Sequence, residues 1–128
     1  METLITAGIE ISVETQFHED ASVPSQNQYL FAYHIFIGNH NSFPVQLLSR
    51  RWIITDMNGD VQLVEGAGVV GRQPVLYTGD SFDYTSGCNF TTPFGKMEGT
   101  YIFENKLSGE KFEVKIPVFK LEAPQVLN

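Results

Sequence analysis

Apolar and polar residues alternate with a period of two along most of the chain. In GIEISVETQF, residues 8–17, Ile9, Ile11, Val13 and Phe17 fall on one face, whereas glutamate and glutamine side chains fall on the other. This alternation is typical of an antiparallel strand that buries one of its faces. The pattern therefore predicts an amphipathic strand over this stretch.

Other β-rich segments follow, separated by polar turns: YLFAYHIFIGN (29–39), VQLLSRRWIITD (45–56), VQLVE (61–65), PVLYT (74–78), SFDYTSG (81–87), KMEGTYIFEN (96–105) and EKFEVKIPVF (110–119). No segment has the 3.6-residue periodicity of an amphipathic helix. Many short strands with turns between them predict an all-β fold, an antiparallel β-sandwich of two sheets.

Two local signals refine this prediction. Asn58-Gly59 lies between apolar runs, and this pair favours a tight hairpin because both residues accept positive φ. Pro117 lacks a donor N–H, so the end of the last strand should lie at a sheet edge or a bulge.

A length of 128 residues is typical of one domain, and we expect a single domain over residues 1–128, with its core at about 8–121 and a short C-terminal tail. The net charge of −7 disfavours nucleic acid and membrane surfaces as partners. Cys88 is the only cysteine, so the chain can form no internal disulfide. A cytoplasmic location is the expectation.

The stretch EGAGVVGRQP, residues 65–74, places Gly66, Gly68 and Gly71 in the spacing G-x-G-x-x-G of dinucleotide-binding turns. Such a turn holds pyrophosphate at the N-terminus of a helix that begins at the third glycine. Here Arg72, Gln73 and Pro74 lead into a strand instead. We therefore expect extended chain after Gly71 and no nicotinamide or flavin cofactor.

Two interpretations of the glycine stretch remain open. The favoured one is structural, because glycines let a long β-connection reverse tightly. In the other, successive backbone amides bind a small phosphate-containing anion, and Arg72 adds charge with Arg50 or Arg51. Val69 and Val70 are expected at the exposed tip of this loop, which suits a surface that packs against a partner.

Arg50 and Arg51 are consecutive in a predicted strand, so their side chains point to opposite faces. A structural salt bridge of one of them with Asp56 or Glu65 is the favoured interpretation, and contact with an anion or a partner is the alternative. Trp52 is expected in the core.

Catalytic and metal-binding patterns are weak. Cys88 has no histidine base nearby in sequence, and the serines lie in no nucleophile motif. Acidic residues beside turns, such as Asp56 and Asp60, commonly bond their own backbone. His18 lies next to two acids in a polar loop, where a solvated cluster is the favoured interpretation. The chain is predicted to be no enzyme and to hold no metal site.

Several collinear motifs together resemble the ApaG family: VQLLSRRWIITDMNGD (45–60), EGAGVVGRQPVLYTGDSFDYTSG (65–87), TPFGKMEGTYIF (92–103) and FEVKIPVFKL (112–121). The resemblance covers about residues 8–121, and GVVGRQPVL, YTSG and IPVFKL are its most specific parts. One departure is YTGD, where the family more often has Pro-Gly-Glu.

The resemblance implies a fibronectin type III or immunoglobulin-like sandwich of unsettled activity, associated with cobalt and magnesium homeostasis. It also implies similarity to domains of a eukaryotic F-box protein and of a polymerase-interacting protein, where the domain resembles a partner-recognition module. A pyrophosphate site on Gly66, Gly68 and Gly71 is a further implication.

These observations lead to one main hypothesis. The chain is expected to be a non-enzymatic module that binds an unidentified protein partner through the loop from Gly66 to Pro74 and the adjoining Arg50 and Arg51. A pyrophosphate or nucleotide bound by the Gly66–Gly71 loop is the alternative, and divalent-cation binding by the acidic N-terminal half is a third. Exposed edge strands also make a homodimer plausible.

Overall fold

A computed structural model describes residues 1–124 of the chain. The described part consists of strands and one 3₁₀ turn, with these bounds: β1 (Glu2–Thr6), β2 (Ile9–Phe17), η1 (Pro24–Gln26), β3 (Tyr29–Asn39), β4 (Val45–Asp56), β5 (Val61–Ala67), β6 (Val75–Leu76), β7 (Ser81–Phe90), β8 (Phe94–Asn105) and β9 (Lys111–Glu122).

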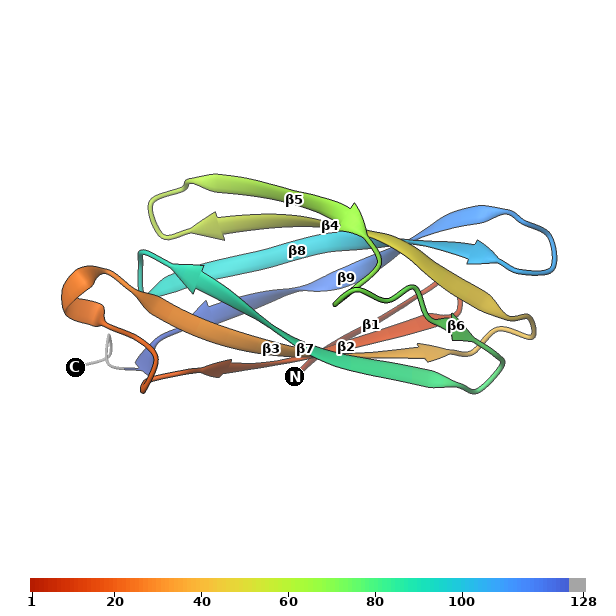
Figure 1. Ribbon diagram of the computed structural model, residues 1–128, viewed down its shortest axis with the longest axis horizontal. Coiled ribbons are helices and arrows are strands. Elements are labelled where there is room, and N and C mark those ends of the chain that lie inside the picture. Colours follow the sequence, from red (N-terminus) through yellow and green to blue (C-terminus); the bar gives the residue numbers. More distant parts are fainter. Residues whose placement is uncertain (125–128) are drawn as a thin grey trace.

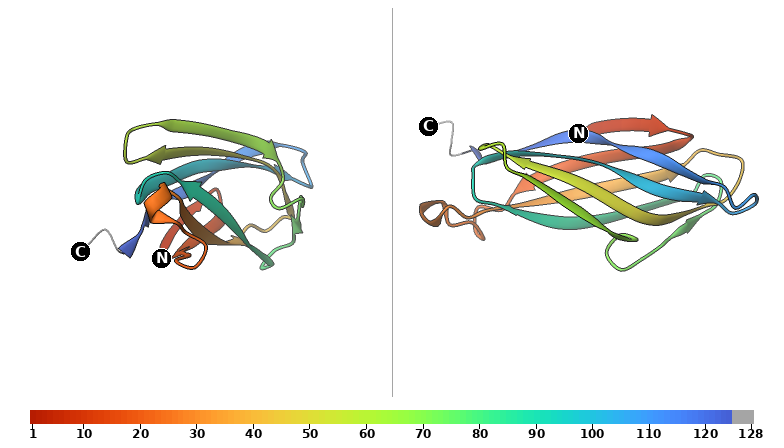
Figure 2. Two further views of the ribbon diagram at one scale, coloured as in Figure 1. Left: turned by 60° about the vertical axis from the view of Figure 1, so that its left-hand side comes forward. Right: turned by 90° about the horizontal axis from the view of Figure 1, so that it is seen from above.

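The strands form two antiparallel sheets that pack face to face (Figures 1 and 2). One sheet has the order β1-β2-β3-β7, and the other has the order β5-β4-β8-β9, with the short β6 also paired to β4. The chain crosses between the sheets after β3, after β6 and after β7. The predicted all-β, immunoglobulin- or fibronectin type III-like sandwich is therefore confirmed.

The core lies between the sheets and follows the alternation in the sequence. Ile9, Ile11 and Val13 of β2 are buried, as the N-terminal pattern predicts. Trp52 of β4 lies at the centre of an aromatic cluster, with its ring centroid 5.5 Å from Tyr33 and 5.9 Å from Phe119. Trp52 is thus a core residue, as expected, and large rings supply much of the buried apolar area.

Two tyrosine hydroxyls are also buried between the sheets. Tyr84 of β7 and Tyr101 of β8 lie 2.6 Å apart, hydroxyl to hydroxyl, so each satisfies the other. Burial raises the pKa of both phenols, because the charged phenolate is poorly solvated there. This pair is a polar bond across the core that links the two sheets.

The N-terminal hairpin was not predicted. β1 pairs with β2 through a turn in which Ala7 and Gly8 have φ of 51° and 76°. The β4–β5 hairpin is where Asn58-Gly59 predicts it, and within this pair Gly59 alone has positive φ. The N–H of Asp56 donates to the carbonyl of Asp60 at 3.1 Å, which encloses a three-residue loop instead of a two-residue turn.

Pro117 behaves as predicted. β9 is the edge strand of its sheet, and its register with β8 shifts between the pairs Met97–Phe119 and Gly99–Ile116, so Pro117 lies in a bulge. The fold continues beyond the expected core: β9 ends at Glu122, and Ala123 is buried. The remainder of the expected tail, residues 125–128, lies outside the described residues.

Candidate partner-binding site at the glycine hairpin

The glycine stretch forms a small hairpin at the side of the sandwich, between β5 and β6. β5 and β6 both pair with β4, and the chain between them leaves the sheet and dips toward the other sheet (Figure 1). The N–H of Gly68 donates to the carbonyl of Leu48 at 2.8 Å, and the N–H of Leu47 donates to that of Pro74 at 3.1 Å. Both ends of the hairpin are therefore attached to β4.

We call residues 68–72 the glycine hairpin. Val69 and Arg72 exchange both backbone hydrogen bonds, at 2.8 and 2.9 Å, so Val70 and Gly71 form a two-residue turn. Val70 has φ of 44° and Gly71 has φ of 77°, as in a type I′ turn. The chain then continues to β6, so the prediction of extended chain after Gly71 is confirmed.

Val70 is an outlier in this turn. A β-branched residue rarely adopts positive φ, because its side chain collides with its own backbone there. The side chain of Val70 nevertheless projects into solvent, with 54% of its surface exposed. The turn thus holds an apolar side chain outward in a strained conformation.

Val69 differs from Val70 in its burial. The expectation that both valines lie exposed at the tip is wrong for Val69. Val69 is completely buried and belongs to the core cluster. Val69 precedes the turn and points inward, whereas Val70 is the first residue of the turn and points outward. Val69 therefore anchors the hairpin, and Val70 is its exposed apolar tip.

The glycines of the G-x-G-x-x-G spacing have structural reasons to be there. A Cβ on Gly66 would lie 2.8 Å from Nη1 of Arg50, and a Cβ on Gly68 would collide with the carbonyl oxygen of Arg72. Gly71 has the positive φ that the second turn position requires. The favoured structural interpretation accounts for each of the three.

Arg50 and Arg51 point in different directions from β4. Nη1 of Arg50 donates to the carbonyls of Ala67 and Gly68, at 3.1 and 3.0 Å, and so fixes the base of the glycine hairpin. Nε of Arg51 lies 3.3 Å from Oε1 of Glu65 in an exposed ion pair, which contributes about 0–1 kcal/mol. Arg51 therefore forms the expected ion pair with an acid, whereas Arg50 binds backbone carbonyls.

The hydrogen bonds of the hairpin bear on the anion hypothesis. An anion-binding nest needs successive N–H groups that are free to point at the ligand. The N–H groups of Gly68, Val69 and Arg72 already donate to carbonyls of the protein. Arg72 is exposed at the hairpin, where its charge is available to an anion or a partner. Pyrophosphate binding at Gly66–Gly71 gains little support from this geometry and stays a prediction.

Cys88 is a poor candidate nucleophile. Its thiol lies on the inner side of β7, and burial raises its pKa to about 11. The reactive thiolate is therefore scarce at neutral pH.

One polar arrangement was not found by sequence reasoning. On the outer face of the β1-β2-β3-β7 sheet, Nε2 of His34 lies 3.0 Å from Oδ2 of Asp83, and Nδ1 lies 2.8 Å from Oγ1 of Thr85. These residues come from β3 and β7, which are far apart in sequence and pair only in the fold. The His34 and Asp83 side chains are 44% and 62% exposed, so this arrangement lies open to solvent on the surface of the sheet.

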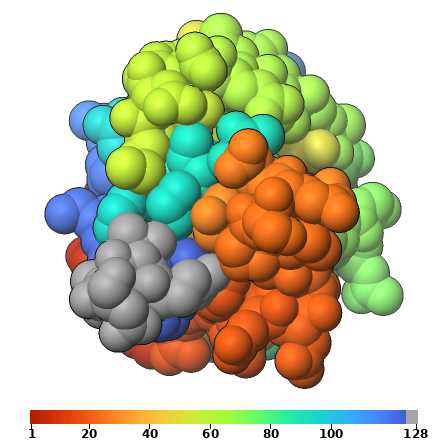
Figure 3. Space-filling view, turned by 90° about the vertical axis from the view of Figure 1, so that its left-hand side faces the viewer, coloured from red at the N-terminus to blue at the C-terminus, as the bar shows by residue number. Residues whose placement is uncertain are grey.

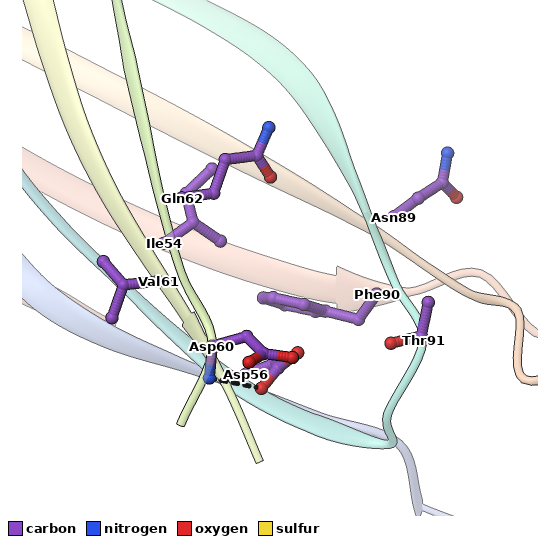
Figure 4. A pocket seen from close by; sticks show the side chains of 8 residues that line it. All are labelled: Ile54, Asp56, Asp60, Val61, Gln62, Asn89, Phe90 and Thr91. Atoms are coloured by element: carbon purple, nitrogen blue, oxygen red, sulfur yellow. Dashed lines mark hydrogen bonds between the residues drawn. The ribbon is translucent and has the colours of Figure 1, made fainter. Parts of the chain in front are cut away.

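A pocket of about 200 Å³ lies at the end of the sandwich that carries the β4–β5 turn (Figures 3 and 4). Asp56 and Asp60 line it beside the apolar Ile54 and Phe90. Oδ1 of Asp56 accepts the N–H groups of Asn58 and Asp60, at 2.8 and 3.1 Å, so this carboxylate shapes the turn, as predicted for acids beside turns.

Residues 1–124 contain neither a cluster of metal ligands nor a membrane-spanning helix. No group of three or more His, Cys, Asp or Glu side chains in that part of the chain could hold a metal ion. None of the helical segments described there is long and apolar enough to cross a membrane. The expected link to cobalt and magnesium stays a prediction.

The fold and the hairpin together define the class of the protein: a β-sandwich of the immunoglobulin and fibronectin type III class that carries a rigid glycine-rich hairpin at its side. The chain belongs to the ApaG domain family, whose model matches residues 19–105. The biochemical role of a protein of this family is uncharacterised, and the match indicates no catalytic family.

Individual relatives agree with this assignment over nearly the whole chain. Protein ApaG of Methylorubrum extorquens (strain PA1) is 50% identical over 121 residues, which cover 94% of this chain and 92% of that protein. Protein ApaG of Brucella abortus (strain S19) is 48% identical over 125 residues, 98% of this chain and 95% of that one. The crystal structure of the putative ApaA protein from Bordetella pertussis is 48% identical with a TM-score of 0.88, covering 91% of this chain and 94% of that one.

Proposed function

We propose that this protein is a non-enzymatic binding module that contacts a protein partner through the glycine hairpin. The observation that carries the proposal is the backbone of Val70: a β-branched residue at φ of 44° whose side chain is more than half exposed. Strained, exposed positions cluster at functional sites, where the surrounding structure holds them in place.

The surroundings of Val70 support this proposal. Val69 is buried beneath it, and Arg50 binds the carbonyls at the base, so the tip is held in a fixed position. A preorganised contact loses little conformational entropy on binding. Arg72 adds a positive charge beside the apolar tip, in a chain whose net charge is −7. The matching partner surface has an apolar pocket with a carboxylate near its rim.

A capture experiment with matched variants tests the proposal. The wild-type chain, V70N and R72E are used as immobilised baits in an extract of the native organism, and captured proteins are quantified by mass spectrometry. Loss of an apolar anchor of this size costs binding about 1–2 kcal/mol, so we expect at least one captured protein to fall about tenfold with V70N. The same protein should fall with R72E.

The control is V118N, because Val118 on β9 is 52% exposed, nearly as much as Val70 at 54%. V118N should retain the partner that V70N loses. Equal capture of every protein by folded wild-type and V70N baits would mean that the hairpin is only a turn. Folding of each bait is checked by circular dichroism, so loss of structure cannot be mistaken for loss of contact.

A further inference from the structure

β5 is an edge strand with a free side. The N–H of Gly68 donates to the carbonyl of Leu48 at one end of the β4–β5 ladder, and the N–H of Asp56 donates to that of Asp60 at the other. Antiparallel pairs alternate between bonded and non-bonded, so the even-numbered residues of β5 bond to β4. The N–H and carbonyl groups of Val61, Leu63 and Glu65 therefore point away from the sheet.

This edge lacks the features that usually prevent strand pairing. Edge strands are commonly protected by lysine, proline or a bulge. β9, the other edge of the same sheet, has lysines and the Pro117 bulge, whereas β5 reads VQLVEGA. Its outward side chains include Val61 and Leu63, which are 61% and 58% exposed. Only at Ala67 is the edge closed, because Arg50 binds the carbonyl of that residue.

We propose that β5 pairs antiparallel with β5 of a second copy of this chain, about a two-fold axis at Leu63. In this register Val61 lies opposite Glu65 of the partner subunit, and Leu63 lies opposite itself. Each pair exchanges two hydrogen bonds, and every outward backbone group from Val61 to Glu65 is satisfied. A two-fold axis requires a surface that is complementary to itself, and the edge meets this condition.

Charge favours a second copy as the occupant of this edge. Glu65 is the charged residue of β5, it is paired with Arg51, and in this register it faces an apolar valine instead of another glutamate. The two copies of Glu65 are therefore not opposed to each other at this edge.

The size of the contact sets its strength. One pair of short strands buries less than the ~1,200 Å² typical of stable complexes. We therefore expect a weak dimer, half-formed at a concentration on the order of hundreds of micromolar. This inference is independent of the partner proposed for the glycine hairpin, because it needs only the purified chain.

Analytical ultracentrifugation and ¹⁵N NMR of the purified chain, from about 0.02 to about 1 mM, test it. The expected result is dimerisation with concentration-dependent amide shifts largest at Val61, Leu63 and Glu65. L63P removes an outward N–H that makes no bond to β4, so the domain should stay folded while dimer affinity falls at least about tenfold. L63T keeps the N–H and the β-propensity, and its dimer should persist.

A chain that remains monomeric at about 1 mM overturns the proposal and leaves the β5 edge to a strand of another protein. Dimerisation of L63P at the affinity of the wild type would also overturn it.

Discussion

At the scale of single residues, Val70 departs most clearly from what its backbone favours. Type I′ turns prefer Asn-Gly, because both residues of the pair tolerate positive φ. This chain has Val70-Gly71 at those two positions, with Val70 at φ of 44°. Position 70 therefore carries an exposed valine instead of the asparagine that this turn favours.

V70N should stabilise the fold. It produces the Asn-Gly pair that the turn favours and removes the strain of a β-branched residue at positive φ, so the free energy of unfolding should rise by about 1 kcal/mol. Urea denaturation followed by tryptophan fluorescence measures the change. V118N, at a similarly exposed valine of β9, should leave the free energy of unfolding within about 0.5 kcal/mol. A clear destabilisation by V70N would contradict the strain at this turn.

At the scale of elements, the glycine hairpin depends on close backbone contact as well as on turn chemistry. Gly68 has φ of 61°, and its Cα approaches the carbonyl of Arg72 so closely that no side chain fits. Gly59 in the β4–β5 turn also has positive φ, at 85°, but its missing Cβ would meet open space. A side chain at Gly59 would add backbone strain alone, whereas a side chain at Gly68 would add both strain and a steric collision.

G68A should therefore cost more stability than G59A. Both substitutions place alanine at positive φ, which costs about 1–2 kcal/mol, and G68A adds a collision with backbone that cannot move freely. We expect the free energy of unfolding to fall by about 3 kcal/mol or more for G68A and by about 1 kcal/mol for G59A. Chemical denaturation of the two variants gives the comparison, and equal losses would show that the close contact has no energetic weight.

At the scale of the whole molecule, the two sheets enclose tyrosine hydroxyls that can ionise readily only when the fold opens and exposes them to water. Burial raises the pKa of Tyr33, Tyr84 and Tyr101 above the usual value of about 10. Near and above that pH the unfolded chain releases these protons, whereas the folded protein retains them. The unfolded state then binds fewer protons, so the free energy of unfolding falls as pH rises.

Alkaline unfolding should therefore begin above about pH 10, and the absorbance of ionised tyrosine should rise together with the loss of the fold. Urea denaturation at a series of alkaline pH values measures the slope. Y84F removes one buried phenol and should flatten the slope, although it costs about 1–2 kcal/mol at neutral pH by leaving the Tyr101 hydroxyl unpaired. Y77F is the control, because Tyr77 is exposed. Ionisation of the buried tyrosines in a folded protein would contradict this account.

Much of the architecture could be predicted from the sequence because a half-buried strand has a local alternation of apolar and polar residues. Ile9, Ile11 and Val13 show by alternation which face of β2 is buried, and Pro117 locates the edge by its missing N–H. β1 escaped prediction, because all of its residues except Thr6 are exposed and its ETLIT pattern carries no clear periodicity. An edge strand that buries little gives little signal.

In the glycine hairpin, too, some features follow from the local sequence and others depend on the tertiary structure. The sequence by itself determined that the chain stays extended after Gly71, since proline and a β-rich run follow the third glycine and prevent a helix. Only the tertiary structure decided that Val69 is buried and Val70 exposed, that Arg50 binds the base of the hairpin, and that His34 meets Asp83. These outcomes depend on which strands become neighbours, and pairing between distant segments leaves no trace in local periodicity.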